Sequence, residues 1–191
     1  MSTFTHFVQN YNGPKVAILA TGGGMSLANL GTIPGASRVL HSFYCPYETE
    51  ETIQFLRANH PAMDDPDHKF IFETSAVSPG ACLELYQAMA ARYPNANVIA
   101  VTAACTSTRW RRGENRAYVA CKSSDGVVEV WHLKMPKATQ DEHAEFSAND
   151  ILLIRGMEDQ GIGNAAMALA GNINTILEGL KADGTITLCN P

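Results

Sequence analysis

The sequence lacks the features that would place it in a membrane, secretory or nucleic-acid-binding class. No apolar run approaches the ~20 residues that a helix needs to cross a bilayer. Residues 1–14 are polar and do not show a basic segment followed by an apolar one, the pattern of a signal peptide. The 14 lysines and arginines are outnumbered by 19 aspartates and glutamates, whereas a nucleic-acid-binding surface requires a basic surplus. These absences predict a cytoplasmic protein with neither a membrane nor a nucleic acid as its partner.

Cysteines are few, odd in number and irregularly spaced. They form no Cys-x-x-Cys pair and stand at Cys45, Cys82, Cys105, Cys121 and Cys189. This spacing argues against a disulfide framework and a structural zinc site, so we expect reduced and mostly buried thiols. The run Asp64 to His68 offers oxygen and imidazole ligands but lacks the spacing of a calcium loop. We therefore predict neither a metal nor a cofactor.

A length of 191 residues, 46% of them hydrophobic, suffices for a single domain with a sizeable core. Apolar and β-rich runs predict strands at 15–20, 37–44, 97–102, 116–122, 127–133 and 185–189, with Asp125-Gly126 as a hairpin turn. Helical spacing predicts helices at 25–30, 48–60, 79–93 and 159–181, the third beginning at Ser78-Pro79. Residues 61–68 and 136–150 are predicted loops. The alternation indicates an α/β fold, a sheet covered by helices with an antiparallel hairpin inside it.

Three glycines, Gly22, Gly23 and Gly24, separate the first strand from the next helix. Glycines let backbone N–H groups approach a ligand, and a helix N-terminus favours an anion. The segment is not a P-loop, because no Lys-Ser/Thr follows it, and it lacks the Gly-x-Gly-x-x-Gly spacing of dinucleotide-binding proteins. A tight turn without a ligand is the alternative interpretation.

From this loop onward the chain resembles the CinA C-terminal domain family, which is nicotinamide-nucleotide amidase-like. Gly23-Gly24 matches the end of the family motif Glu-Ser-Cys-Thr-Gly-Gly, and Pro34-Gly35-Ala36-Ser37 falls at the offset of the family's Pro-Gly-x-Ser. Tyr47 falls on the family tyrosine without a gap. Ala76-Val77-Ser78, Val101-Thr102 and the strand at 116–120 also look like family segments. The resemblance implies a three-layer CinA-like core at 15–180, after an N-terminal extension at 1–14, within one domain spanning 1–191.

The departures from the family pattern affect its chemistry. The presumed nucleophilic serine is replaced by Ala20, and the lysine after the tyrosine by Thr52. A methyl group cannot attack an amide, and the loss of the lysine removes an activating charge. The resemblance therefore implies lost or altered amidase chemistry, unless Thr21 or Cys105 acts as a replacement nucleophile.

The one dense basic cluster combines Arg109, Arg111 and Arg112 with Trp110. Arginines beside an aromatic ring can clamp a phosphate or stack on a base. The alternative is a solvated loop without a ligand. Because the cluster follows the segment that forms the family's pocket, we retain it as a candidate phosphate site.

Three hypotheses remain open. The first is a CinA-like protein that keeps a pocket for a nucleotide-like small molecule. The second is an active, divergent amidohydrolase on nicotinamide mononucleotide, and the third is a structural or assembly protein. A homo-oligomer is compatible with all three. The candidate catalytic residues are Thr21, Tyr47, Thr102 and Cys105, and the candidate ligand-binding residues are Ala20, Gly22, Gly23, Gly24, Ser37, Arg109, Arg111 and Arg112.

Overall fold

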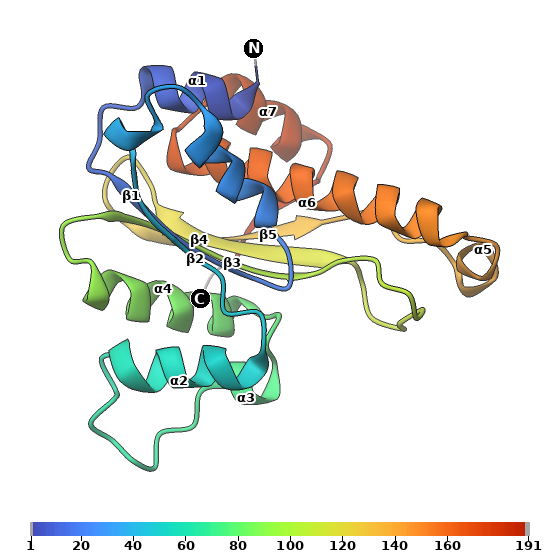
Figure 1. Ribbon diagram of the computed structural model, residues 1–191, viewed down its shortest axis with the longest axis horizontal. Coiled ribbons are helices and arrows are strands. Elements are labelled where there is room, and N and C mark those ends of the chain that lie inside the picture. The colour runs from blue at the N-terminus through green and yellow to red at the C-terminus, as the bar shows by residue number, and fades with distance from the viewer. Residues whose placement is uncertain (1, 190–191) are drawn as a thin grey trace.

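A mixed sheet forms the centre of the computed structural model, which describes residues 2–189 (Figure 1). Its six strands run in the order β2-β1-β3-β4-β5-β6. Their bounds are β1 Val16–Thr21, β2 Leu40–Tyr44, β3 Asn97–Ala104, β4 Arg116–Lys122, β5 Val128–Lys134 and β6 Ile186–Cys189. β1 pairs in parallel with β2 and β3, and the pairs from β3 to β6 are antiparallel. The predicted α/β fold with an internal hairpin is confirmed.

Helices cover both faces of the sheet, which makes the molecule three-layered (Figure 1). One face carries α2 (Thr49–Asn59), α3 (Ile71–Thr74) and α4 (Pro79–Arg92). The other carries α1 (Thr3–Asn10), the 3₁₀ segment η1 (Met25–Thr32), α6 (Ala148–Ala170) and α7 (Asn174–Ala182). The first half of α6 extends beyond the sheet, and α5 (Gln140–Ala144) lies at its tip. None of the described helices is both long and apolar enough to cross a membrane.

The central strand β1 is buried along its whole length because both of its faces are covered. Its side chains alternate between two cores. Ile18 and Ala20 join the core beneath α6, and Ala17 and Leu19 join the core beneath α4. The same alternation in β3 decides which core each site residue faces.

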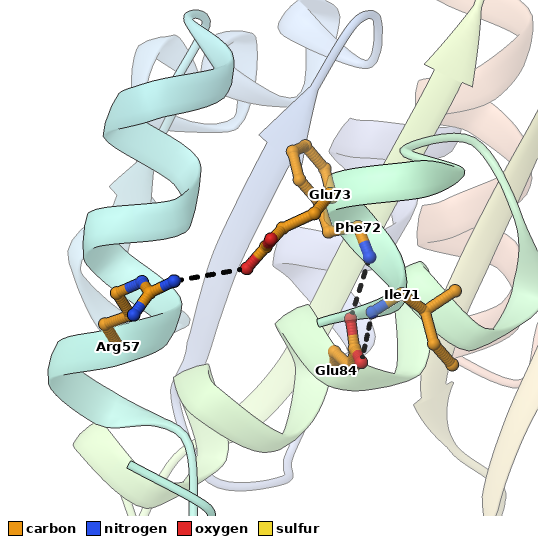
Figure 2. Close-up of polar contacts among 5 residues, drawn as sticks. All are labelled: Arg57, Ile71, Phe72, Glu73 and Glu84. Carbon is orange, nitrogen blue, oxygen red and sulfur yellow. Dashed lines mark hydrogen bonds and ion pairs between the residues drawn. The ribbon is translucent and has the colours of Figure 1, made fainter. Parts of the chain in front are cut away.

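A buried carboxylate fixes the short helix α3 on α4 (Figure 2). Glu84 of α4 accepts hydrogen bonds from the backbone N–H groups of Ile71, at 2.8 Å, and Phe72, at 3.1 Å. These are two of the N–H groups that a helix cannot satisfy internally at its first turn. Beside them, Arg57 of α2 forms an ion pair with Glu73 at 3.4 Å. The layer opposite α6 is thus tied together by polar contacts as well as by its apolar core.

Several predicted boundaries are confirmed and others were wrong. Ser78 caps α4 by accepting a hydrogen bond from the Ala81 N–H, and Gly126 takes positive φ in the hairpin turn. No helix or strand was predicted in the N-terminal extension at 1–14, yet it contains α1, which buries Phe4, Phe7 and Val8. The predicted long helix at 159–181 is two helices, α6 and α7, and α6 begins eleven residues earlier than predicted. The strand predicted from 37 begins at Leu40, after the short 3₁₀ segment η2 (Ala36–Arg38).

Candidate functional site

The glycine loop leaves the end of β1 and lies against the end of β3 and the segment that follows it. Gly22 and Gly24 have φ values of +76° and +83°, which side chains rarely adopt. A Cβ atom on Gly22 would also collide with the carbonyl oxygen of Ala103, and one on Gly23 would lie 2.8 Å from the Cys105 sulfur. The loop therefore requires glycine for the close approach of two backbones.

The N–H groups at the end of this loop bind a carboxylate of the protein itself. Asp159 of α6 accepts hydrogen bonds from the N–H groups of Gly24 at 2.6 Å, Met25 at 2.9 Å and Ser26 at 2.6 Å. The Ser26 hydroxyl in turn donates to the Asp159 carbonyl at 2.7 Å. These N–H groups form the first turn of η1, where negative charge is favoured. The sequence predicted that the anion of a ligand binds at this loop. In the structure the N–H groups of residues 24–26 instead donate to the carboxylate of Asp159.

Arg155, one turn earlier on α6, joins the loop to the predicted tyrosine. Its Nη2 donates to the Gly22 carbonyl at 3.2 Å and to the Tyr47 hydroxyl at 3.1 Å, and its Nη1 donates to the Thr106 carbonyl at 2.8 Å. Tyr47 is 63% exposed, so its ring is open to solvent above this contact. The structure thus places Tyr47 beside the glycine loop.

Glu158 holds the segment after β3 from the same helix. It is 7% exposed and accepts from the Thr106 N–H at 2.6 Å, the Thr106 hydroxyl at 2.8 Å and the Asn115 amide at 2.7 Å. Residues three and four positions apart share a face of a helix. Arg155, Glu158 and Asp159 therefore act from one face of α6 on both loops at the end of the sheet.

The predicted ligand-binding residue Ala20 and the other predicted catalytic residues do not converge. Ala20 has no exposed surface and faces the α6 core. Thr21 and Thr102 are paired in register on neighbouring strands, and by strand alternation both face the α4 side. The Thr102 hydroxyl is buried and has no hydrogen-bond partner among residues 2–189. Thr21 and Thr102 are thus separated from Cys105, which belongs to the α6 core, by the thickness of the sheet.

Cys105 is buried, with 3% of its surface exposed. Burial, and secondly the negative charge of Glu158, raises the pKa of its thiol to about 11. The thiolate is the nucleophilic form of cysteine. At neutral pH the Cys105 side chain is therefore overwhelmingly a protonated thiol.

The arginines of the basic cluster have different surroundings. Nη2 of Arg111 donates to the Cys105 carbonyl at 2.7 Å and to Asn115 Oδ1 at 3.1 Å, so it holds its own loop. Arg109 and Arg112 are exposed, and their guanidinium groups have no hydrogen bond or ion pair among residues 2–189. Trp110 lies beneath the Lys137 ammonium, 4.5 Å from the ring centroid.

Ser37 lies at the opposite end of the sheet from the glycine loop. It precedes β2, whereas the glycine loop follows β1. Because β1 and β2 are parallel neighbours, the start of β2 and the end of β1 lie at opposite ends of the strands. The structure therefore does not bring Ser37 to the glycine loop.

Sequence reasoning did not select Arg155, Glu158 or Asp159 as site residues, and its helix began at residue 159, which left Arg155 and Glu158 outside it. A signal was present in the chain. Ser147 and Asp150 form a capping box, in which each side chain accepts the other residue's N–H. This motif places residues 155, 158 and 159 within one helix. No group of three His, Cys, Asp or Glu side chains within residues 2–189 is placed to hold a metal ion.

The architecture is similar to that of solved CinA superfamily structures. The competence/damage-inducible protein CihA from Agrobacterium tumefaciens aligns over 85% of this chain and 93% of its own, with a TM-score of 0.54 and 16% identity. A CinA superfamily protein from Klebsiella pneumoniae aligns over 89% and 94%, with a TM-score of 0.59 and 13% identity. One from Escherichia coli aligns over 84% and 87%, with a TM-score of 0.55 and 12% identity. The sequence matches no protein-family model and no curated protein. The chain therefore has the predicted CinA-like fold.

Proposed function

We propose that this CinA-fold protein binds a nucleotide-like small molecule and no longer hydrolyses an amide bond by the mechanism that the family resemblance implies. The observation that carries the proposal is the position of Asp159. Hydrolysis of an amide needs N–H donors for the developing oxyanion. In this chain the N–H groups of Gly24 to Ser26 already bind a carboxylate, which would repel a second negative charge.

The residues at the family's reactive positions support the same conclusion. Ala20 provides only a buried methyl group. Thr52, at the position of the family lysine, is buried and donates its hydroxyl hydrogen bond to the backbone carbonyls of Pro46 or Glu48. Neither replacement candidate fits the role of nucleophile. Thr21 faces the α4 core, whereas the glycine loop contacts Cys105 in the α6 core. The Cys105 thiol is protonated at neutral pH.

For the ligand, the exposed ring of Tyr47 beside Arg155 is the feature that favours a nucleotide. An exposed aromatic ring can stack on a base, and an adjacent guanidinium adds a positive charge that suits a phosphate. We place the protein in the cytoplasm in this proposal, because all five cysteines are free thiols, as is typical of a reducing compartment. A homo-oligomer remains compatible with it, since α6 exposes Leu152, Leu153 and Met157.

The test combines an ammonia-release assay on nicotinamide mononucleotide with thermal-shift measurements on a nucleotide panel. We expect a shift without ammonia release, and we expect Tyr47→Ala to remove the shift. Met63→Ala is the matched control, because Met63 is also a large exposed side chain but lies in the 61–70 loop. Ammonia release at a typical enzyme rate, ~1–10³ s⁻¹, would overturn the proposal in favour of a divergent amidohydrolase. The absence of both a thermal shift and ammonia release would overturn the proposal in favour of a structural protein.

A further inference from the structure

A second candidate site lies away from Tyr47, between the 105–115 loop, β5 and the helices α5, α6 and α7. It is a cavity of about 680 Å³. This volume lies within the range of small-molecule sites, roughly 300–1,000 Å³. Its walls are mainly apolar and include Leu133, Met135, Phe146, Ile154, Ile162 and Leu180.

Gly161, an exposed glycine of α6, is part of the cavity lining. Ile154, Glu158, Gly161 and Ala165 all line it, and at ~100° per residue they lie within an arc of about 60° on α6. A Cβ atom on Gly161 would meet no other atom within 4 Å. By contrast, a Cβ on Gly163, two residues along the same helix, would collide with Ser26. Gly163 is therefore required by packing, whereas the exposed Gly161 has room for a side chain beside the cavity.

Basic side chains outnumber acidic ones in the lining of the cavity. Four cationic side chains line it, Arg109, Arg111, Lys134 and Lys137, against two carboxylates. Both carboxylates already accept hydrogen bonds, Glu158 from Thr106 and Asn115, and Glu142 from Thr139. Arg111 and Lys137 donate to backbone carbonyls of the loop. The side chains of Arg109 and Lys134 have no hydrogen bond or ion pair among the described residues, and of the two the guanidinium of Arg109 can form the paired hydrogen bonds that suit a carboxylate.

We infer that this cavity binds an amphipathic anion, a molecule with a single apolar chain or ring system and a carboxylate-like head. The apolar part would lie against α6 and β5, where burial of apolar surface is favourable. The head would pair with the exposed Arg109, because a charged group held beside an apolar cavity needs a partner of opposite sign. The excess of positive charge selects an anion over a cation of the same shape. This inference is independent of the proposed function at Tyr47, since the two sites use different residues.

The experiment titrates the full chain with decanoate and with the decyltrimethylammonium cation by calorimetry. We expect decanoate to bind at least about tenfold more tightly than the cation. Arg109→Ala should weaken decanoate about ten- to a hundredfold, the usual effect of losing a charge-assisted pair, and leave the cation unchanged. Gly161→Phe should weaken binding of decanoate by placing a ring at the cavity wall.

The matched control is Gly179→Phe. Gly179 is also a helical glycine with open space around its Cβ position, but it lies on α7 and does not line the cavity. Both variants should fold, because glycine is a poor helix residue and no neighbouring atom must move. Equal affinities for the two probes, or unchanged decanoate binding by Gly161→Phe, would overturn the inference. So would sedimentation showing a dimer that Gly161→Phe dissociates, because a second copy would then cover the cavity.

Discussion

The carboxylate of Asp159 lies 2.6 Å from the backbone nitrogen of Gly24 and joins segments that are 135 residues apart in the chain. The glycine loop has the shape and the donors of an anion site, and α6 supplies the anion. The shape of the loop therefore depends on α6, as does the Arg155 contact to Tyr47. A ligand that approaches Tyr47 meets a loop whose charge is already balanced.

Asp159→Ala should destabilise the protein by about 1.5–3 kcal/mol, because three N–H groups lose a charged acceptor. Asp159→Asn, which keeps one oxygen acceptor, should have a smaller effect. The measurement is the free energy of unfolding in urea. Asp64→Ala is the control, since Asp64 is exposed in a loop. If the Asp159 and Asp64 variants were equally stable, Asp159 would not hold the loop.

Ala20→Ser should not restore hydrolysis. The position has no exposed surface, so the new hydroxyl would be buried in the α6 core and would cost ~1–3 kcal/mol unless it found a partner. The variant would still lack a lysine at Thr52, and Asp159 would still occupy the loop's N–H groups. Ammonia release from nicotinamide mononucleotide and the urea midpoint are measured together. Release by the folded variant above the unmutated protein would show that only the serine was missing.

The parts of the fold that local sequence determines were predicted correctly. Ser78-Pro79 starts α4, Asp125-Gly126 turns the hairpin, and the apolar run that includes Ile18 forms the central strand. These signals depend on a few neighbouring residues, so one sequence suffices to read them. The break between α6 and α7 does have a local signal, Gly171-Asn172, because glycine and asparagine favour helix ends and Asn172 has φ of +50°. That signal was outweighed in the prediction by the helical spacing of apolar residues, which continues through the break.

The candidate site was predicted less completely, because it depends on contacts between distant segments. The match without gaps from Gly23 to Tyr47 placed the tyrosine, and the structure shows it beside the loop. No local pattern indicates that Asp159 binds the Gly24 N–H. Likewise, no pattern at Gly161 reveals a cavity, since the wall opposite it comes from β5 and α7. Tertiary packing, which periodicity does not describe, decides both features.

The arginines of the basic cluster should differ in their effect on stability. Arg111→Ala should cost ~1–3 kcal/mol, because Arg111 donates to the Cys105 carbonyl and to Asn115 from within the loop. Arg112→Ala should change the free energy of unfolding by less than about 0.5 kcal/mol, since its exposed side chain has no partner in residues 2–189. Arg112 is the matched control for Arg111, and urea denaturation measures both. Equal losses would mean that the loop is not held by Arg111.

The buried Cys105 thiol should make stability fall at alkaline pH. Its pKa is raised to about 11, above the ordinary value of 9.0, chiefly by burial. The unfolded chain therefore ionises first, so the contribution of the thiol is fully present below about pH 9 and is lost as the pH rises toward 11. Burial also raises the pKa of Cys121, to about 12, so the comparison must isolate one thiol. Cys105→Ser serves this purpose, because a hydroxyl does not titrate in this range.

The two proteins are unfolded in urea at about pH 8, 9, 10 and 11, and their free energies of unfolding are subtracted at each pH. The advantage of the unmutated protein over Cys105→Ser should shrink across this window. Alkylation near pH 7.5 gives a second readout: Cys45, which is partly exposed, should react with iodoacetamide well before Cys105. A difference in stability that stays constant with pH, together with rapid labelling of Cys105, would show an accessible thiolate. The thiol would then return as a candidate nucleophile, because the strongest argument against it is its protonation.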